Sequence, residues 1–245
     1  MSRWVLKGLQ TGVVTTRYPA GEELSPGTTP GLPQALPCGE AESEALISRC
    51  PTGALRRAVG QVAVDHARCV HCYRCARGIA EPLPWEKGFE WAIFRGESEV
   101  PKTFERSLHI RVVDAGDCGA CLNEVKLLNN PFYNMHRLGF FITPTPRKAD
   151  VLLVVGPVTY HMETALLKAY EAMPMPKLVM AVGTCALSGG IFGPGFATGR
   201  GVADLLPVDV EIPGCPPPPL AILHGLLVLA GRKPAAQSKE PTVAG

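Results

Sequence analysis

The sequence predicts an α/β protein in which an open, parallel sheet follows a small unit organised by metal. After residue 104, short β-branched runs alternate with helical patterns, as they do in βαβ units. Several of these runs are apolar almost throughout, which indicates strands covered on both faces. Before residue 104, four cysteines fall within residues 50–75, a segment too short to build a large core.

The composition limits the classes of function. The chain has 245 residues, enough for one or two domains, and only 19% of them are charged, which suggests that part of the surface meets another protein. A net charge of +2 argues against a nucleic-acid binder. The longest apolar stretch, 219–231, is interrupted by His224 and is too short to cross a bilayer. The start carries no secretory segment, so we expect a cytoplasmic protein whose nine cysteines bind metal rather than form disulfides.

The N-terminal part is expected to contain little regular structure. Residues 4–18 are mildly apolar, so we expect them to dock on another surface. Residues 19–37 are too rich in Pro and Gly for regular structure, so we expect a strap, an irregular segment that runs across a surface. Residues 82–107 form a mixed linker that either covers a partner surface or encloses a satellite core with its aromatic residues Trp85, Phe89, Trp91 and Phe94.

The C-terminal part supplies the sheet. Strands are predicted at 108–113, 151–155, 177–182 and 208–212, and helices at 120–129, 162–172 and 220–230. We therefore expect three regions: a strap, metal-binding unit and linker over 1–104, an α/β domain over 105–232, and a disordered tail over 233–245.

The first cysteine set has the spacing of an iron–sulfur site. Cys69-Val-His-Cys72-Tyr-Arg-Cys75 presents three thiols, and Cys50-Pro51 supplies a fourth, as in bacterial ferredoxins. Residues 36–82 thus resemble a ferredoxin reduced to one [4Fe-4S] cluster, which implies a small α+β fold. Zinc is the alternative, although zinc sites favour paired Cys-x-x-Cys motifs. Cys38 fits neither pattern and has no assigned role.

The second cysteine set follows three predicted strands. Cys118 and Cys121 come after the first strand, Cys185 after the third and Cys215 after the fourth. Ligands of open parallel sheets lie at the carboxyl ends of the strands, so the four thiols should meet on one rim. The alternative is that Cys185 and Cys215 only fill core space.

Four motifs in this region resemble one family. They are Cys118-Gly-Ala-Cys121, Ala149-Asp150 through Gly156, Gly183-Thr-Cys185 through Gly190, and Pro213-Gly-Cys215-Pro-Pro. Together they resemble the 20 kDa subunit of respiratory complex I and the small subunit of [NiFe]-hydrogenases. The resemblance implies a flavodoxin-like fold in which Cys118, Cys121, Cys185 and Cys215 hold the [4Fe-4S] cluster nearest the active or quinone site of a large subunit.

Details of the motifs favour the hydrogenase branch. Complex I subunits have two adjacent cysteines where this chain has Cys118-x-x-Cys121. The chain also stops about 30 residues after Cys215, like the membrane-bound hydrogenase and formate hydrogenlyase group. Residues 6–19 resemble the ferredoxin-like subunit of those complexes. The implied partners are a large subunit of the hydrogenase or complex I 49 kDa type, membrane subunits and a further iron–sulfur donor.

These observations predict a non-autonomous oxidoreductase subunit that relays electrons through two [4Fe-4S] clusters, bound peripherally on the cytoplasmic side of the inner membrane. The alternatives are a quinone-reducing complex I-like subunit and a zinc-stapled structural subunit. Glu124 matches an acidic position of the family and either serves a proton or hydrogen-bond role or is a plain helix charge. Three arginines beside the first set are candidates for favouring the reduced state of its cluster: Arg68, Arg74 and Arg77. Four histidines are further candidate ligands: His71, His109, His136 and His161. For all seven, packing or surface roles are the simpler alternative.

Overall fold

A six-stranded sheet forms the centre of the computed structural model, which describes residues 3–21, 23, 31–78, 82–96 and 100–236. The strand order is β6-β11-β10-β9-β7-β8, and every pair is parallel except β6 with β11. In chain order the five parallel strands follow the flavodoxin-like arrangement 2-1-3-4-5, so the predicted fold class is confirmed. Their bounds are β6 Ile93–Phe94, β7 Leu108–Asp114, β8 Phe140–Ile142, β9 Val151–Val155, β10 Leu178–Val182 and β11 Val210–Ile212.

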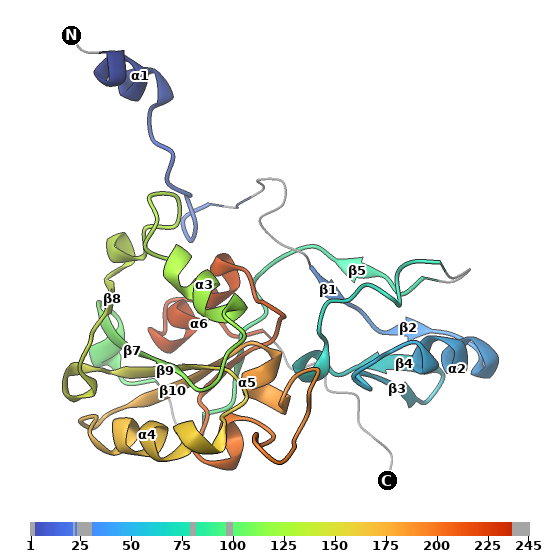
Figure 1. Ribbon diagram of the computed structural model, residues 1–245. Coiled ribbons are helices and arrows are strands. Elements are labelled where there is room, and N and C mark those ends of the chain that lie inside the picture. Colours follow the sequence, from blue (N-terminus) through green and yellow to red (C-terminus); the bar gives the residue numbers. More distant parts are fainter. Residues whose placement is uncertain (1–2, 22, 24–30, 79–81, 97–99, 237–245) are drawn as a thin grey trace.

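Helices cover both faces of this sheet (Figure 1). On one face lie α3 (Ala120–Leu127) and α6 (Pro219–Leu229), and on the other lies α4 (Tyr160–Glu171). Strand β9 contributes to the hydrophobic cores on both faces of the sheet, because its side chains alternate between a cluster with α6 and a cluster with α4. This explains why its sequence is apolar at every position.

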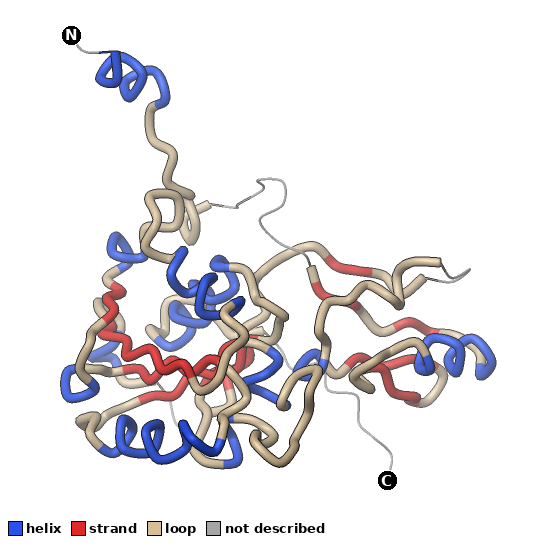
Figure 2. Tube along the Cα trace, viewed as in Figure 1, coloured by secondary structure: helices blue, strands red, loops and turns tan. Residues whose placement is uncertain are grey.

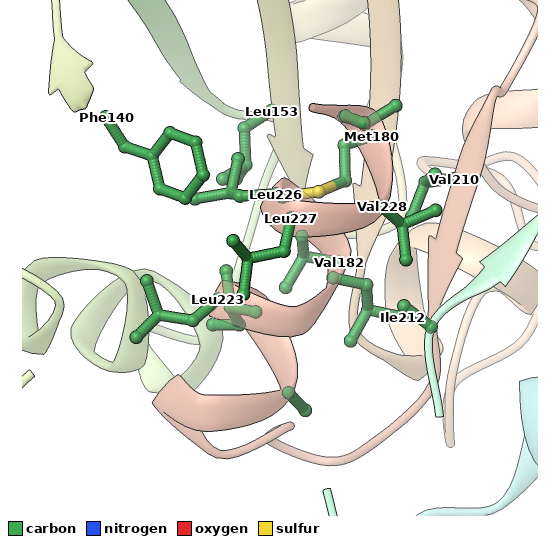
Figure 3. Packing of buried hydrophobic residues seen from close by; sticks show 14 of the residues in the cluster. Phe140, Leu153, Met180, Val182, Val210, Ile212, Leu223, Leu226, Leu227 and Val228 are labelled. Carbon is green, nitrogen blue, oxygen red and sulfur yellow. The ribbon is translucent and has the colours of Figure 1, made fainter. Parts of the chain in front are cut away.

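Helix α6 is buried along its whole length. Its leucines pack against Met180, Val182 and Ile212 of the sheet (Figure 3). His224 is 1% exposed, accepts a hydrogen bond from Ala92 N–H at Nδ1 (3.2 Å) and lies 3.0 Å from Pro234 O at Nε2. The ring is therefore neutral with its proton on Nε2, and burial lowers its pKa. Within the part of the chain that the structure describes, no helix is both long and apolar enough to span a bilayer.

A smaller α+β unit carries the first cysteine set. Its antiparallel sheet has the order β2-β4-β3, with strands Leu36–Pro37, Gln61–Val64 and Leu55–Ala58, and α2 (Glu40–Ser48) packs on it (Figure 2). Its own core contains Leu46, Leu55, Val62, Val64 and Leu83. A two-stranded ribbon of β1 (Leu32–Pro33) and β5 (Trp85–Glu86) lies beside it.

The linker and the chain ends differ in part from the expectations. Phe89 and Trp91 are 9% and 7% exposed and join the core of the large sheet, so the linker is internal rather than partner-facing there. Helix α1 (Arg3–Thr11) buries no residue, but Tyr18 further along is buried. Residues 22 and 24–30 of the predicted strap lie outside the described residues. So do 237–245 of the predicted tail, whereas Ala236 N–H donates to Ala92 O at 2.9 Å.

Candidate metal centres

The first set of four cysteines lines one cavity. Cys50, Cys69, Cys72 and Cys75 all face it, from the loop after α2 and the loop after the short 3₁₀ helix η1 (His66–Arg68). Burial raises the pKa of the Cys69 thiol to about 12, and the other three thiols add to the rise. This coupling places the four sulfurs close to one another.

Backbone donors and one arginine hold this loop pair together. Ala54 N–H donates to the sulfur of Cys50 at 3.2 Å, as expected for a thiolate held in a metal site. The Arg49 guanidinium donates to the carbonyls of Arg74 (3.1 Å) and Arg77 (2.9 Å), which ties the Cys50 loop to the Cys75 loop. Sequence reasoning missed Arg49, whose partners lie 25 and 28 residues away.

The second set of four cysteines lies at the carboxyl ends of β7, β10 and β11. Gly183 N–H donates to Ile212 O at 2.8 Å and Thr184 N–H to Gly214 O at 2.9 Å, which brings the Cys185 and Cys215 segments side by side. Cys121 is 4% exposed, and its pKa is raised by burial and by Asp117 and the three other thiols. The pKa of Cys185 rises to about 11 for the same reasons. The structure thus brings together the four thiols that the strand-end argument predicted.

Two glycines keep side chains away from these sulfurs. A Cβ at Gly183 would collide with the Cys121 sulfur, and a Cβ at Gly190 would lie 2.5 Å from the Cys185 sulfur. Both residues also have φ in the left-handed region, at +90° and +67°. The backbone is therefore shaped to leave space on the side of the thiols.

An acidic loop positions Cys118 and Cys121. Asp114 Oδ1 accepts the backbone N–H groups of Gly116 (3.0 Å) and Asp117 (2.8 Å), and Asp117 Oδ2 accepts those of Gly119 and Leu122, both at 3.0 Å. Among the described residues, Asp117 Oδ1 is buried and has no hydrogen-bond partner. Its negative charge faces the thiols, because it raises the pKa of Cys121, Cys185 and Cys215.

The two cysteine sets are joined by hydrogen bonds from α5 (Thr184–Ser188). The Thr184 hydroxyl lies 2.8 Å from Cys69 O and 3.2 Å from Gly214 O, and the shorter distance favours donation of its single proton to Cys69 O. The Ser188 hydroxyl lies 2.8 Å from Ala67 O. Cys185 is covalently next to Thr184, so one hydrogen bond connects a residue of the first set with a neighbour of the second. No pattern along the chain indicates this contact.

The donors of both sets are thiols alone. No group of three His, Cys, Asp or Glu side chains in the described ranges is arranged to hold one metal ion. Tetrahedral zinc with Zn–S bonds of about 2.3 Å would need its sulfurs within about 4 Å of one another. In a cubane each thiolate binds a different iron, so the sulfurs stand further apart. Four thiols and a backbone N–H donor to sulfur are a donor set that an iron–sulfur cluster can use.

The other candidates are exposed, partly buried on a helix, or paired with neighbouring side chains. Glu124 is on α3, and burial raises its pKa. Arg68 pairs with Asp65 at 3.3 Å, and the Arg77 guanidinium lies 5.3 Å from the Tyr73 ring centre. The candidates Arg74, His109, His136 and His161 are exposed, and Cys38 packs on the small core with Cys50 and Cys75.

Comparisons with known proteins agree with the motifs. The family described as NADH ubiquinone oxidoreductase, 20 kDa subunit, matches residues 118–229. The chain is 41% identical to a subunit of the NADH-quinone oxidoreductase of Carboxydothermus hydrogenoformans over 58% of the chain and 77% of that protein. It is 39% identical to the probable membrane-bound hydrogenase subunit mbhJ of Pyrococcus furiosus over 58% of the chain and 84% of that protein.

Formate hydrogenlyase subunit 7 of Escherichia coli is 36% identical over 64% of the chain and 60% of that protein. The prediction of an oxidoreductase subunit that does not act alone is confirmed by these relatives. With the strand order and the motifs at the strand ends, they show that the chain belongs to the family of NADH ubiquinone oxidoreductase 20 kDa subunits.

Proposed function

We propose that this chain relays electrons through two [4Fe-4S] clusters to or from the active site of a separate, hydrogenase-like large subunit in a membrane-associated complex. Cys50, Cys69, Cys72 and Cys75 would hold the first cluster, and Cys118, Cys121, Cys185 and Cys215 the second. A [4Fe-4S] cluster takes up and releases one electron with little movement of its ligands. The proposal includes the division of the chain into an N-terminal part with the first cluster, residues 1–104, and an α/β domain with the second, residues 105–232.

One observation carries the proposal: the Thr184 hydroxyl joins Cys69 of the first set to the residue before Cys185 of the second. A relay needs its two centres at a fixed, short separation, and this bond together with Ser188–Ala67 supports such a separation.

The partners are inferred from the relatives. Formate hydrogenlyase and membrane-bound hydrogenase are the complexes named for two of them, and NADH-quinone oxidoreductase for the third. The Cys118-x-x-Cys121 spacing favours the hydrogenase branch, and we place the subunit peripherally on the cytoplasmic side of the membrane. Hydrogen-dependent reduction of a one-electron dye by the purified complex would support this branch; quinone reduction without any hydrogen activity would favour the complex I-like alternative.

Metal analysis with EPR spectroscopy tests the relay. Anaerobically purified protein should contain about eight irons per chain and two distinct signals on reduction. Cys69→Ala and Cys185→Ala should each lose about four irons and a different signal. Cys38→Ala is the matched control, because it removes the one cysteine outside both sets and should keep all the iron. Stoichiometric zinc without iron would contradict the proposal and favour a structural subunit.

A further inference from the structure

The indole of Trp85 is a buried donor without an acceptor in the described part of the chain. Its Nε1 is inaccessible to solvent and makes no hydrogen bond there. An indole nitrogen can only donate, and buried donors in folded proteins nearly always have a partner. Its position therefore points to an acceptor that belongs to the site beside it.

That site is the first cysteine set. Trp85 lines the same cavity as Cys50, Cys69, Cys72 and Cys75. The Trp85 side chain faces the Cys75 thiol of this cavity, although its N–H makes no well-formed hydrogen bond to the free thiol. The indole N–H is thus directed at the Cys75 side of the cavity.

Several contacts fix Trp85 in this position. Leu83 N–H donates to Cys75 O at 2.8 Å, which ties the approaching chain to the cysteine itself. Trp85 lies opposite Pro33 in the β1–β5 ribbon. Its ring stacks on Tyr73, with centroids 4.2 Å apart, and meets the edge of His71 at 5.6 Å. The N–H direction is therefore set by the fold rather than by a free side chain.

We infer that the Trp85 indole N–H donates a hydrogen bond to a sulfur of the first cluster, at or next to Cys75, and thereby raises the reduction potential of that cluster. The inference rests on the proposed function. A reduced cluster carries one more negative charge than an oxidised one, and a hydrogen bond to a more negative acceptor is stronger. Trp85 therefore stabilises the reduced form more than the oxidised form and acts as a positioning and tuning residue.

His71 is a weaker candidate for the same role. Its Nε2 is also buried without a partner among the described residues, but it is not part of the cavity lining. The inference therefore concerns Trp85 alone.

A redox titration monitored by EPR tests the inference on the full-length chain. Trp85→Phe keeps an aromatic ring and removes the N–H. At a fixed solution potential, the reduced-to-oxidised ratio of the first cluster should fall about tenfold, which corresponds to a midpoint about 59 mV lower for a one-electron couple. Trp91→Phe is the matched control, because that indole donates to Pro213 O at 2.9 Å and its loss should leave the first cluster unchanged.

A second measurement does not depend on the variant folding. Wild-type protein with ¹⁵N in its indole rings should show a ¹⁵N hyperfine coupling to the reduced first cluster in pulsed EPR, and the coupling should persist in Trp91→Phe. Intact clusters with an unchanged midpoint and no ¹⁵N coupling would overturn the inference and leave the proposed relay standing. Absence of any cluster signal would overturn both.

Discussion

Replacing Thr184 by valine tests the junction between the two cysteine sets. The substitution keeps the shape of the side chain and removes the hydroxyl that donates to Cys69 O at 2.8 Å. Thr184 is 1% exposed, so water cannot readily take the place of the hydroxyl. Cys69 O then loses its donor in a partly buried position.

The expected loss follows from these contacts. One hydrogen bond of this kind contributes about 1 kcal/mol, and an acceptor left unpaired raises the penalty toward about 2 kcal/mol. For a chain of 245 residues, a loss of about 1–2 kcal/mol lowers the Tm by about 2–8 °C. Ser188→Ala removes the neighbouring bond to Ala67 O and should lower the Tm further when the two changes are combined.

Thermal denaturation under anaerobic conditions at one scan rate measures the effect. Thr143→Val is the matched control, because Thr143 is also buried but the hydrogen bond from its hydroxyl to Thr145 O is long and weak, at 3.5 Å. In EPR spectra of the fully reduced protein, Thr184→Val should also weaken the magnetic interaction between the two clusters. A Thr184→Val protein as stable as Thr143→Val, with an unchanged interaction, would refute the reasoning.

Three further results are expected. Gly183→Ala puts a Cβ against the Cys121 sulfur at a φ of +90°, so the second cluster should be lost. Metal analysis should then find about four irons, with the EPR signal of the first cluster kept; full iron content would show that Gly183 is not needed to leave space for the second cluster. Asp117→Asn removes a negative charge beside the second thiol set, so the midpoint of the second cluster should rise in a redox titration; an unchanged or lower value would count against this role. Burial holds the pKa of His224 below 6.5 in the folded chain, so the unfolded chain binds more protons below that pH, and stability should be complete above about pH 6.5 and fall on acidification. Thermal scans between about pH 5 and 8 should show this fall in wild type and less of it in His224→Gln; equal slopes would exclude the assignment.

The strands that carry the second cysteine set could be predicted because their signal is local. The run 151–155 is apolar at every position and coincides with β9. The predicted runs 177–182 and 208–212, before Cys185 and Cys215, end at the same residues as β10 and β11. Strand β8 was missed, because its three residues are shorter than the runs of four to eight from which strands are recognised, and two of them are exposed at the sheet edge. For the linker, the sequence left a partner-facing surface and a buried core as equal alternatives, because the pattern of Phe89 and Trp91 does not show what packs on them.

The amino-acid sequence alone determined which eight thiols are candidates and where they stand: three at spacing three in a loop, a fourth in the upstream Cys50-Pro51 pair, and four at the ends of parallel strands. Both patterns are properties of short segments, and the geometry of a turn or a strand end places them in the same way in many folds. Only the tertiary structure decided that Thr184 reaches Cys69, 115 residues away, and that Trp85 turns its N–H toward the first set. Such contacts depend on how finished elements pack against each other, and packing between distant segments leaves no period or spacing in the chain.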